Sequence, residues 1–104
     1  RLVPAEASSV DEVRREEGKI VEFNGERLAV YRNAKGRIQA CSAICTHLGC
    51  YVRWNTAEKT WDCPCHGSRF STSGEVLNGP ATQGLKQVVP GGKPSRIRRA
   101  EEAA

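Results

Sequence analysis

Two short runs of the sequence place a cysteine close to a histidine. Cys45 is followed two residues later by His47, and Cys63 is followed three residues later by His66. Two thiolates and two imidazoles form a donor set that suits iron or zinc. The chain has 2 histidines, and both lie in these runs, which favours metal binding over a nucleophilic cysteine–histidine pair.

Zinc is the main alternative metal. Structural zinc sites also combine two cysteines with two histidines, but they usually group ligands of one kind, as Cys-x2–4-Cys or His-x3–5-His. Here each run supplies one ligand of each kind, and this split spacing favours iron. A zinc-stabilised binding module is therefore the alternative function from a different class. Such a protein would be colourless, so a visible spectrum would distinguish it from an iron protein.

The residues around these ligands extend the pattern to Cys45-Thr46-His47-Leu48-Gly49-Cys50 and Cys63-Pro64-Cys65-His66-Gly67-Ser68. Over roughly residues 18–85 the chain resembles Rieske iron–sulfur domains. The resemblance implies a 2Fe–2S cluster with two cysteines on one iron and two histidines on the other. The implied ligands are Cys45, Cys63, His47 and His66. A disulfide between Cys50 and Cys65 is also implied, because the branch typified by cytochrome bc complexes joins its two cluster loops in this way.

The same resemblance assigns roles to residues around the cluster. Ser68 matches a serine whose hydroxyl bonds a bridging sulfur, and Leu48 would lie exposed at the cluster tip, facing the redox partner. Gly79 and Pro80 match the proline loop that covers the cluster from a third side. High-potential members carry a tyrosine at the position of Phe70. Since phenylalanine has no hydroxyl, we expect a potential below that of the respiratory proteins.

A finer resemblance is to Rieske domains at the C-terminus of bacterial FAD-dependent oxidoreductases, carried by the two runs and by residues 61–70 and 76–81. It implies that an upstream flavin domain, or a separate redox partner protein, exchanges electrons with this chain. The alternatives are an anchor-less Rieske subunit of a cytochrome bc-type quinol-oxidising complex and a soluble Rieske ferredoxin serving an oxygenase. Phe70 speaks against the first, and Cys50 with Cys65 against the second. The chain has no nucleotide-binding glycine motif, so we expect an electron-transfer module without a substrate site of its own.

The remaining sequence indicates a small all-β protein. Its 104 residues are 38% hydrophobic, so the core is modest, and a cluster and a disulfide would stabilise it. Alternating or apolar runs separated by turns predict strands at residues 19–23, 27–32, 37–42, 51–54, 60–62 and 75–77, with Asn24-Gly25 as a hairpin turn. The family fold is three stacked antiparallel sheets with the two cluster-binding loops at one end.

We divide the chain into an N-terminal arm (1–17), a Rieske domain (18–89) and a basic C-terminal tail (90–104). In the arm, Ser9 and Glu12 fit the capping box of a short helix that Gly18 would end, and an extended loop is the alternative. The tail has no aromatic residues to stack bases, so we expect no nucleic-acid partner. No run reaches the length of a membrane span. Because the chain begins at Arg1, we expect a processed product or part of a longer protein.

Cys41 is the fifth cysteine and is expected to be a buried free thiol. Such a thiol argues against a strongly oxidising compartment, whereas a disulfide between Cys50 and Cys65 argues for one. We place the protein in the cytoplasm, with a periplasmic or membrane-associated location as alternatives.

Overall fold

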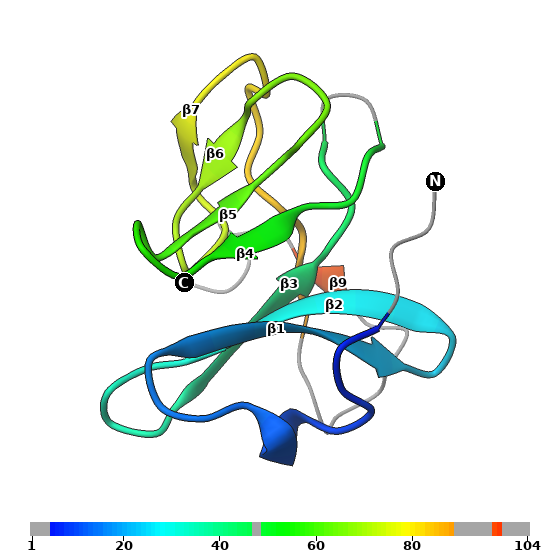
Figure 1. The fold of residues 1–104 in the computed structure, drawn as a ribbon. Coiled ribbons are helices and arrows are strands. Elements are labelled where there is room, and N and C mark those ends of the chain that lie inside the picture. The colour runs from blue at the N-terminus through cyan, green and yellow to red at the C-terminus, as the bar shows by residue number, and fades with distance from the viewer. Residues whose placement is uncertain (1–4, 47–48, 89–96, 99–104) are drawn as a thin grey trace.

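The protein folds into two antiparallel β-sheets, which lie one above the other in Figure 1. This computed structural model describes residues 5–46 and 49–88, together with the backbone of residues 97–98. The all-β class expected from the sequence is confirmed. The family fold implied three sheets, whereas the described residues form two, with Ile44 and Tyr51 pairing in an isolated bridge outside them.

The five-stranded sheet has the strand order β1-β2-β3-β8-β9. Its strands are β1 (Glu17–Phe23), β2 (Glu26–Arg32), β3 (Ile38–Ser42), β8 (Gln87–Val88) and β9 (Ile97–Arg98). Asn24 and Gly25 connect β1 to β2 with φ angles of 52° and 82°, and a two-residue type I′ hairpin needs positive φ at both positions. The hairpin predicted from Asn-Gly is therefore confirmed.

The four-stranded sheet has the order β4-β5-β6-β7. Its strands are β4 (Arg53–Asn55), β5 (Thr60–Asp62), β6 (Arg69–Phe70) and β7 (Val76–Asn78). The chain passes from β3 in the first sheet to β4 in the second through residues 43–52. Within the second sheet, residues 63–68 connect β5 to β6. Both cysteine–histidine runs therefore lie in connections that end on this sheet.

The buried residues form two clusters, one on each face of the five-stranded sheet. Strand β2 contributes to both, because Leu28 and Val30 belong to one cluster and Ala29 and Tyr31 to the other. This division follows from the alternation of side chains along a strand. The larger cluster joins the two sheets and includes Trp61, Phe70, Cys45 and Cys63, so the cysteines of the two runs are part of the main core.

The first described residues cover the outer face of the five-stranded sheet. Ala7 and Val13 are buried against it, and the predicted helix is reduced to one 3-10 turn, η1 (Val10–Glu12). Gly18 does not end a helix but lies inside β1, where an added Cβ would come within 2.5 Å of the Trp54 ring. The glycine is thus required by side-chain packing between the sheets. In the described part of the chain, no helix has the length and apolar character needed to cross a membrane.

Candidate metal centre

The connection from β3 to β4 contains a six-residue loop, loop 1 (residues 45–50). At its base the Cys45 N–H donates to the Cys50 carbonyl at 2.6 Å, and the Gly49 N–H donates to the Cys45 carbonyl at 3.0 Å. Gly49 has a φ of 74°, which glycine adopts without steric penalty. These two bonds close the loop on the residue that carries the first thiol.

The connection from β5 to β6, loop 2 (residues 63–68), has the same backbone pattern. The Cys63 N–H donates to the Ser68 carbonyl at 2.8 Å, and the Gly67 N–H donates to the Cys63 carbonyl at 3.0 Å. Gly67, at the position equivalent to that of Gly49, has a φ of 83°. The two loops thus share one frame, with a cysteine at the first position and a glycine of positive φ at the fifth.

The first cysteines of the two loops lie side by side in the core. Cys45 is 1% exposed and Cys63 is 3% exposed. Burial raises the pKa of the Cys63 thiol, and the neighbouring Cys45 thiol raises this pKa further. The backbone N–H groups of Cys65 and His66 lower it. A metal cation would favour the thiolate forms, because its charge compensates theirs.

The structure describes the histidine of loop 2 but not the histidine of loop 1. His66 is exposed on loop 2, so an imidazole there can contact solvent or a partner while the thiols stay buried. His47 lies outside the described residues, as does Leu48, so their predicted positions at the tip are predictions still.

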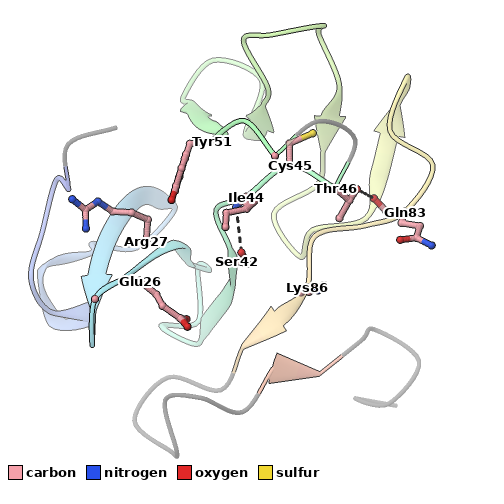
Figure 2. Close-up of a pocket in the computed structure, with 11 residues that line it drawn as sticks. Glu26, Arg27, Ser42, Ile44, Cys45, Thr46, Tyr51, Gln83 and Lys86 are labelled. Atoms are coloured by element: carbon pink, nitrogen blue, oxygen red, sulfur yellow. Dashed lines mark hydrogen bonds between the residues drawn. The ribbon is translucent and has the colours of Figure 1, made fainter. Parts of the chain in front are cut away.

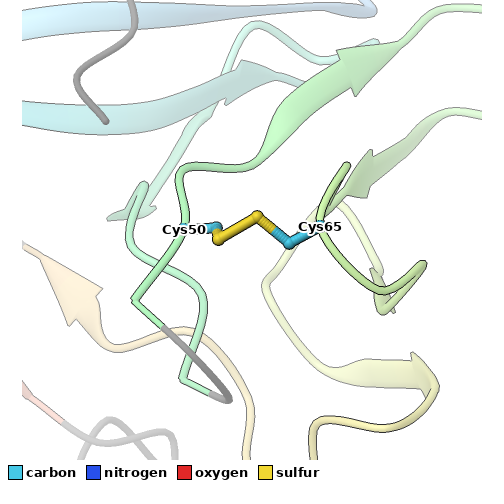
Figure 3. The surroundings of a disulfide bond; sticks show 2 residues. All are labelled: Cys50 and Cys65. Atoms are coloured by element: carbon cyan, nitrogen blue, oxygen red, sulfur yellow. A yellow bond between two sulfur atoms is a disulfide. The ribbon is translucent and has the colours of Figure 1, made fainter.

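The second cysteines of the two loops form a disulfide. Cys50 and Cys65 are bonded at 2.00 Å with their Cα atoms 6.5 Å apart, and Figure 3 shows the bond joining loop 1 to loop 2. The pairing expected from the family resemblance is confirmed. The Sγ atom of Cys63 lies within 4.8 Å of both bonded sulfurs, so the disulfide directly borders the pair of buried thiols.

A third segment, residues 79–86, is hydrogen-bonded to both loops. The Ala81 N–H donates to Ser68 Oγ at 3.0 Å, and Thr46 Oγ1 donates to the Gln83 carbonyl at 2.6 Å, as the dashed line in Figure 2 shows. Ala81 directly follows Gly79 and Pro80, so its bond to Ser68 attaches the proline-containing segment to loop 2; the predicted role of this segment in covering a cluster stays a prediction. Its bond to Thr46 was not predicted, although a hydroxyl between the first cysteine and histidine was a signal for it.

A shallow hollow of about 530 Å³ lies beside loop 1. Ile44, Thr46, Tyr51 and Lys86 are among the residues that line it, and Figure 2 shows them around Cys45. Ile44 is 44% exposed, so an apolar side chain is presented to solvent next to the loop.

Comparison with known proteins decides what this arrangement is. A family model described as the Rieske [2Fe-2S] domain matches residues 4–89. The chain belongs to this family. Its members carry a 2Fe–2S cluster, which serves electron transfer.

Individual Rieske proteins are similar to most of the chain. YhfW of Bacillus subtilis, named as a Rieske 2Fe-2S iron-sulfur protein, is 56% identical over 72 residues, which are 69% of this chain and 14% of that protein. The cytochrome b6-f complex iron-sulfur subunit of Chlorobaculum tepidum is 46% identical over 67% of this chain and 38% of its own length. The chain thus spans well under half the length of either relative.

A solved structure gives the same result for the fold. The plasma membrane Rieske protein PetC3 from Synechocystis PCC 6803 matches with a TM-score of 0.64 and 32% identity, covering 79% of this chain and 84% of that one.

The donor set of this Rieske domain fits its cofactor. The buried thiols of Cys45 and Cys63 adjoin one another, as two thiolate ligands of one iron must. With His66 exposed on loop 2, these residues and His47 would hold the cluster. The Trp61 indole N–H adds a buried donor in the same core, with no hydrogen-bond partner among the described residues.

Two buried residues near the cysteines of loop 2 were predicted to tune the potential of the cluster. Ser68 is fully buried, and its oxygen accepts from Ala81; a hydroxyl can donate at the same time, as the family role of this serine requires. Phe70 is also fully buried, in the cluster of core residues that contains both thiols. The Phe70 ring therefore offers no hydrogen-bond donor to this core.

Proposed function

We propose that this Rieske domain is the electron-transfer module of a larger FAD-dependent oxidoreductase. The observation that carries the proposal is the match to YhfW, whose 72 aligned residues are 14% of a protein that is therefore about 500 residues long. At 56% identity, a Rieske domain very like this one is a small part of that longer chain. The motif residues 61–70 and 76–81 point to the flavin-linked group of such proteins.

The proposed ligands are Cys45 and Cys63 on one iron and His47 and His66 on the other. When bound, the cluster accepts and releases one electron at a time. The chain's own residues bury the thiolate side and leave loop 2 exposed at Pro64, Cys65 and His66. Electrons would therefore pass between the cluster and a partner on the histidine side.

A subunit of a quinol-oxidising complex is the second candidate. The iron-sulfur subunit of Chlorobaculum tepidum, which is 46% identical over 70 residues, favours it, as does the disulfide. Phe70 weighs against it, because the tyrosine of high-potential members is missing. The module of a longer chain is preferred because YhfW has the higher identity over a similar length and is about 500 residues long.

The parent protein, purified whole, provides the test. We expect it to contain bound flavin as well as the cluster, and stopped-flow reduction of the flavin to be followed by cluster reduction at a rate that does not depend on protein concentration. That result identifies transfer within one chain. A parent without flavin, or a cluster reduced only by added quinol, would assign the domain to the second candidate.

A further inference from the structure

Asp62 and Arg69 form the last rung of the β5–β6 pair before loop 2. They face each other in the strand register, with Arg69 Nε 3.5 Å from Asp62 Oδ1. The next rung is the bond from the Cys63 N–H to the Ser68 carbonyl. The ion pair therefore lies at the neck of the loop, one residue from a proposed ligand.

Further donors hold the Asp62 carboxylate in place. Thr60 Oγ1 donates to Oδ1 at 2.7 Å, and Asn55 Nδ2 donates to Oδ2 at 2.8 Å. Asn55 belongs to β4, Thr60 to β5 and Arg69 to β6. The Asp62 side chain thus connects three neighbouring strands. The bonds from Thr60 and Asn55 orient its carboxylate independently of the arginine.

The backbone at this neck needs such support. Strand β6 has only two residues, and its pairing with β7 shifts register between Arg69 and Phe70. Few ladder hydrogen bonds hold the strand that leaves loop 2, so a cross-strand side-chain pair matters more here than in a long strand.

We propose that Asp62 and Arg69 are a positioning pair that keeps the neck of loop 2 closed and so fixes Cys63. The inference rests on the proposed ligand role of Cys63. Both side chains would act through the backbone of β5 and β6. Because the pair is partly exposed, at 28% and 38%, its loss should open the neck only about two- to fivefold more often.

Arg53 offers a matched control. It faces Asp62 from β4, on the other side of β5, and it is exposed. It has the same charge and the same neighbour as Arg69 but lies on a strand that does not lead into loop 2. Arg53→Gln should therefore leave the neck unchanged.

The test is hydrogen–deuterium exchange by mass spectrometry on peptides covering residues 60–71 of the intact purified protein. Arg69→Gln and Asp62→Asn should each speed exchange at the neck about two- to fivefold, and Arg69→Lys should restore protection. The same two variants should release iron to a chelator faster, by a similar factor, while the melting temperature stays that of Arg53→Gln.

Equal exchange in Arg69→Gln and Arg53→Gln would overturn the proposal, as would faster exchange without faster iron release. Faster release that merely follows a lower melting temperature would also overturn it, because the pair would then be an ordinary stabilising contact. Failure of the proposed function would be seen separately, as wild-type protein that contains no iron or has no flavin partner. The comparison of exchange rates between Arg69→Gln and Arg53→Gln could still be made in that case.

Discussion

Ser68 Oγ accepts the backbone N–H of Ala81 at 3.0 Å, and this bond joins loop 2 to the proline-containing segment at a fully buried hydroxyl. We predict that this serine has two functions, of which the structure shows the first. It satisfies a buried amide of the third segment, and its hydrogen can be directed at a sulfur of the cluster. Substitution of this residue should affect both stability and redox potential.

Ser68→Ala should lower the midpoint potential and the free energy of unfolding. The potential falls because a hydrogen bond to sulfur stabilises the more negative, reduced state; a bond of about 1.5–3 kcal/mol sets an upper limit of roughly 65–130 mV for one electron. Leaving the Ala81 amide unsatisfied should cost about 1–3 kcal/mol. Voltammetry and denaturant unfolding measure the two effects.

Ser71→Ala is the control for this variant. The Ser71 hydroxyl accepts from the Ser73 and Glu75 N–H groups in the turn between β6 and β7, at the end of β6 opposite to loop 2. It should lower stability without changing the potential. An unaltered potential in Ser68→Ala would show that the hydroxyl does not reach a cluster sulfur.

Phe70→Tyr should raise the midpoint potential, because the added hydroxyl can donate to a ligand sulfur. The ring is fully buried, so a hydroxyl without such an acceptor would instead destabilise the protein by about 1–3 kcal/mol. Potential and stability measured together separate these outcomes. Lower stability at constant potential would mean that position 70 does not point at the cluster.

The disulfide should stabilise the loops chiefly when the cluster is absent. Cys50 and Cys65 are 15 residues apart in sequence, for which chain entropy predicts about 3 kcal/mol. Since the cluster ties the same two loops together, the effects should not add. We expect the double variant Cys50→Ser, Cys65→Ser to lose less stability with iron bound than without it. Equal losses in denaturant unfolding of the two forms would contradict this coupling.

The buried thiol of Cys41 should be unreactive in the native protein. Burial raises its pKa from 9.0 to about 12, partly offset by a hydrogen bond from Gln87. Because the folded state holds this proton more tightly than the unfolded state, the contribution to stability is complete below pH 9 and is lost as pH rises from about 9 to 12. Wild type should lose stability over this window faster than Cys41→Ala.

Iodoacetamide at pH 8 gives an independent measurement of the same thiol. Cys41 should be labelled only after the chain is denatured, because both burial and protonation protect it. Labelling of the native protein at the rate of an exposed cysteine would show that this thiol is accessible.

Strands of three or more residues, including β5 predicted at 60–62, could be located from the sequence, whereas the two-residue strands and the long-range contacts could not. Strands β1 to β3 and the Asn24-Gly25 turn follow from runs of five or more residues and a specific dipeptide. Strands β6 and β8 have two residues each, too few to show a period, and their pairing depends on distant partners. Gly18 was expected at a helix end because its true constraint, the Trp54 ring, is remote in sequence.

In the candidate site, too, the features that depend on local sequence were predicted, and the contacts between distant segments were not. The disulfide and the adjoining thiols followed from the family motif, since its spacing is local. The bonds from Thr46 to Gln83 and from Ala81 to Ser68, and the ion pair between Asp62 and Arg69, join segments whose proximity exists only in the fold.

Iron and acid-labile sulfide, determined per chain on the purified protein, test the central claim most directly. We expect two irons and two sulfides, as in the Rieske [2Fe-2S] domain that the chain matches, and loss of both in Cys45→Ser and Cys63→Ser but not in Cys41→Ser. One zinc per chain without labile sulfide would contradict the account and would assign Cys45, Cys63 and His66 to a structural zinc site.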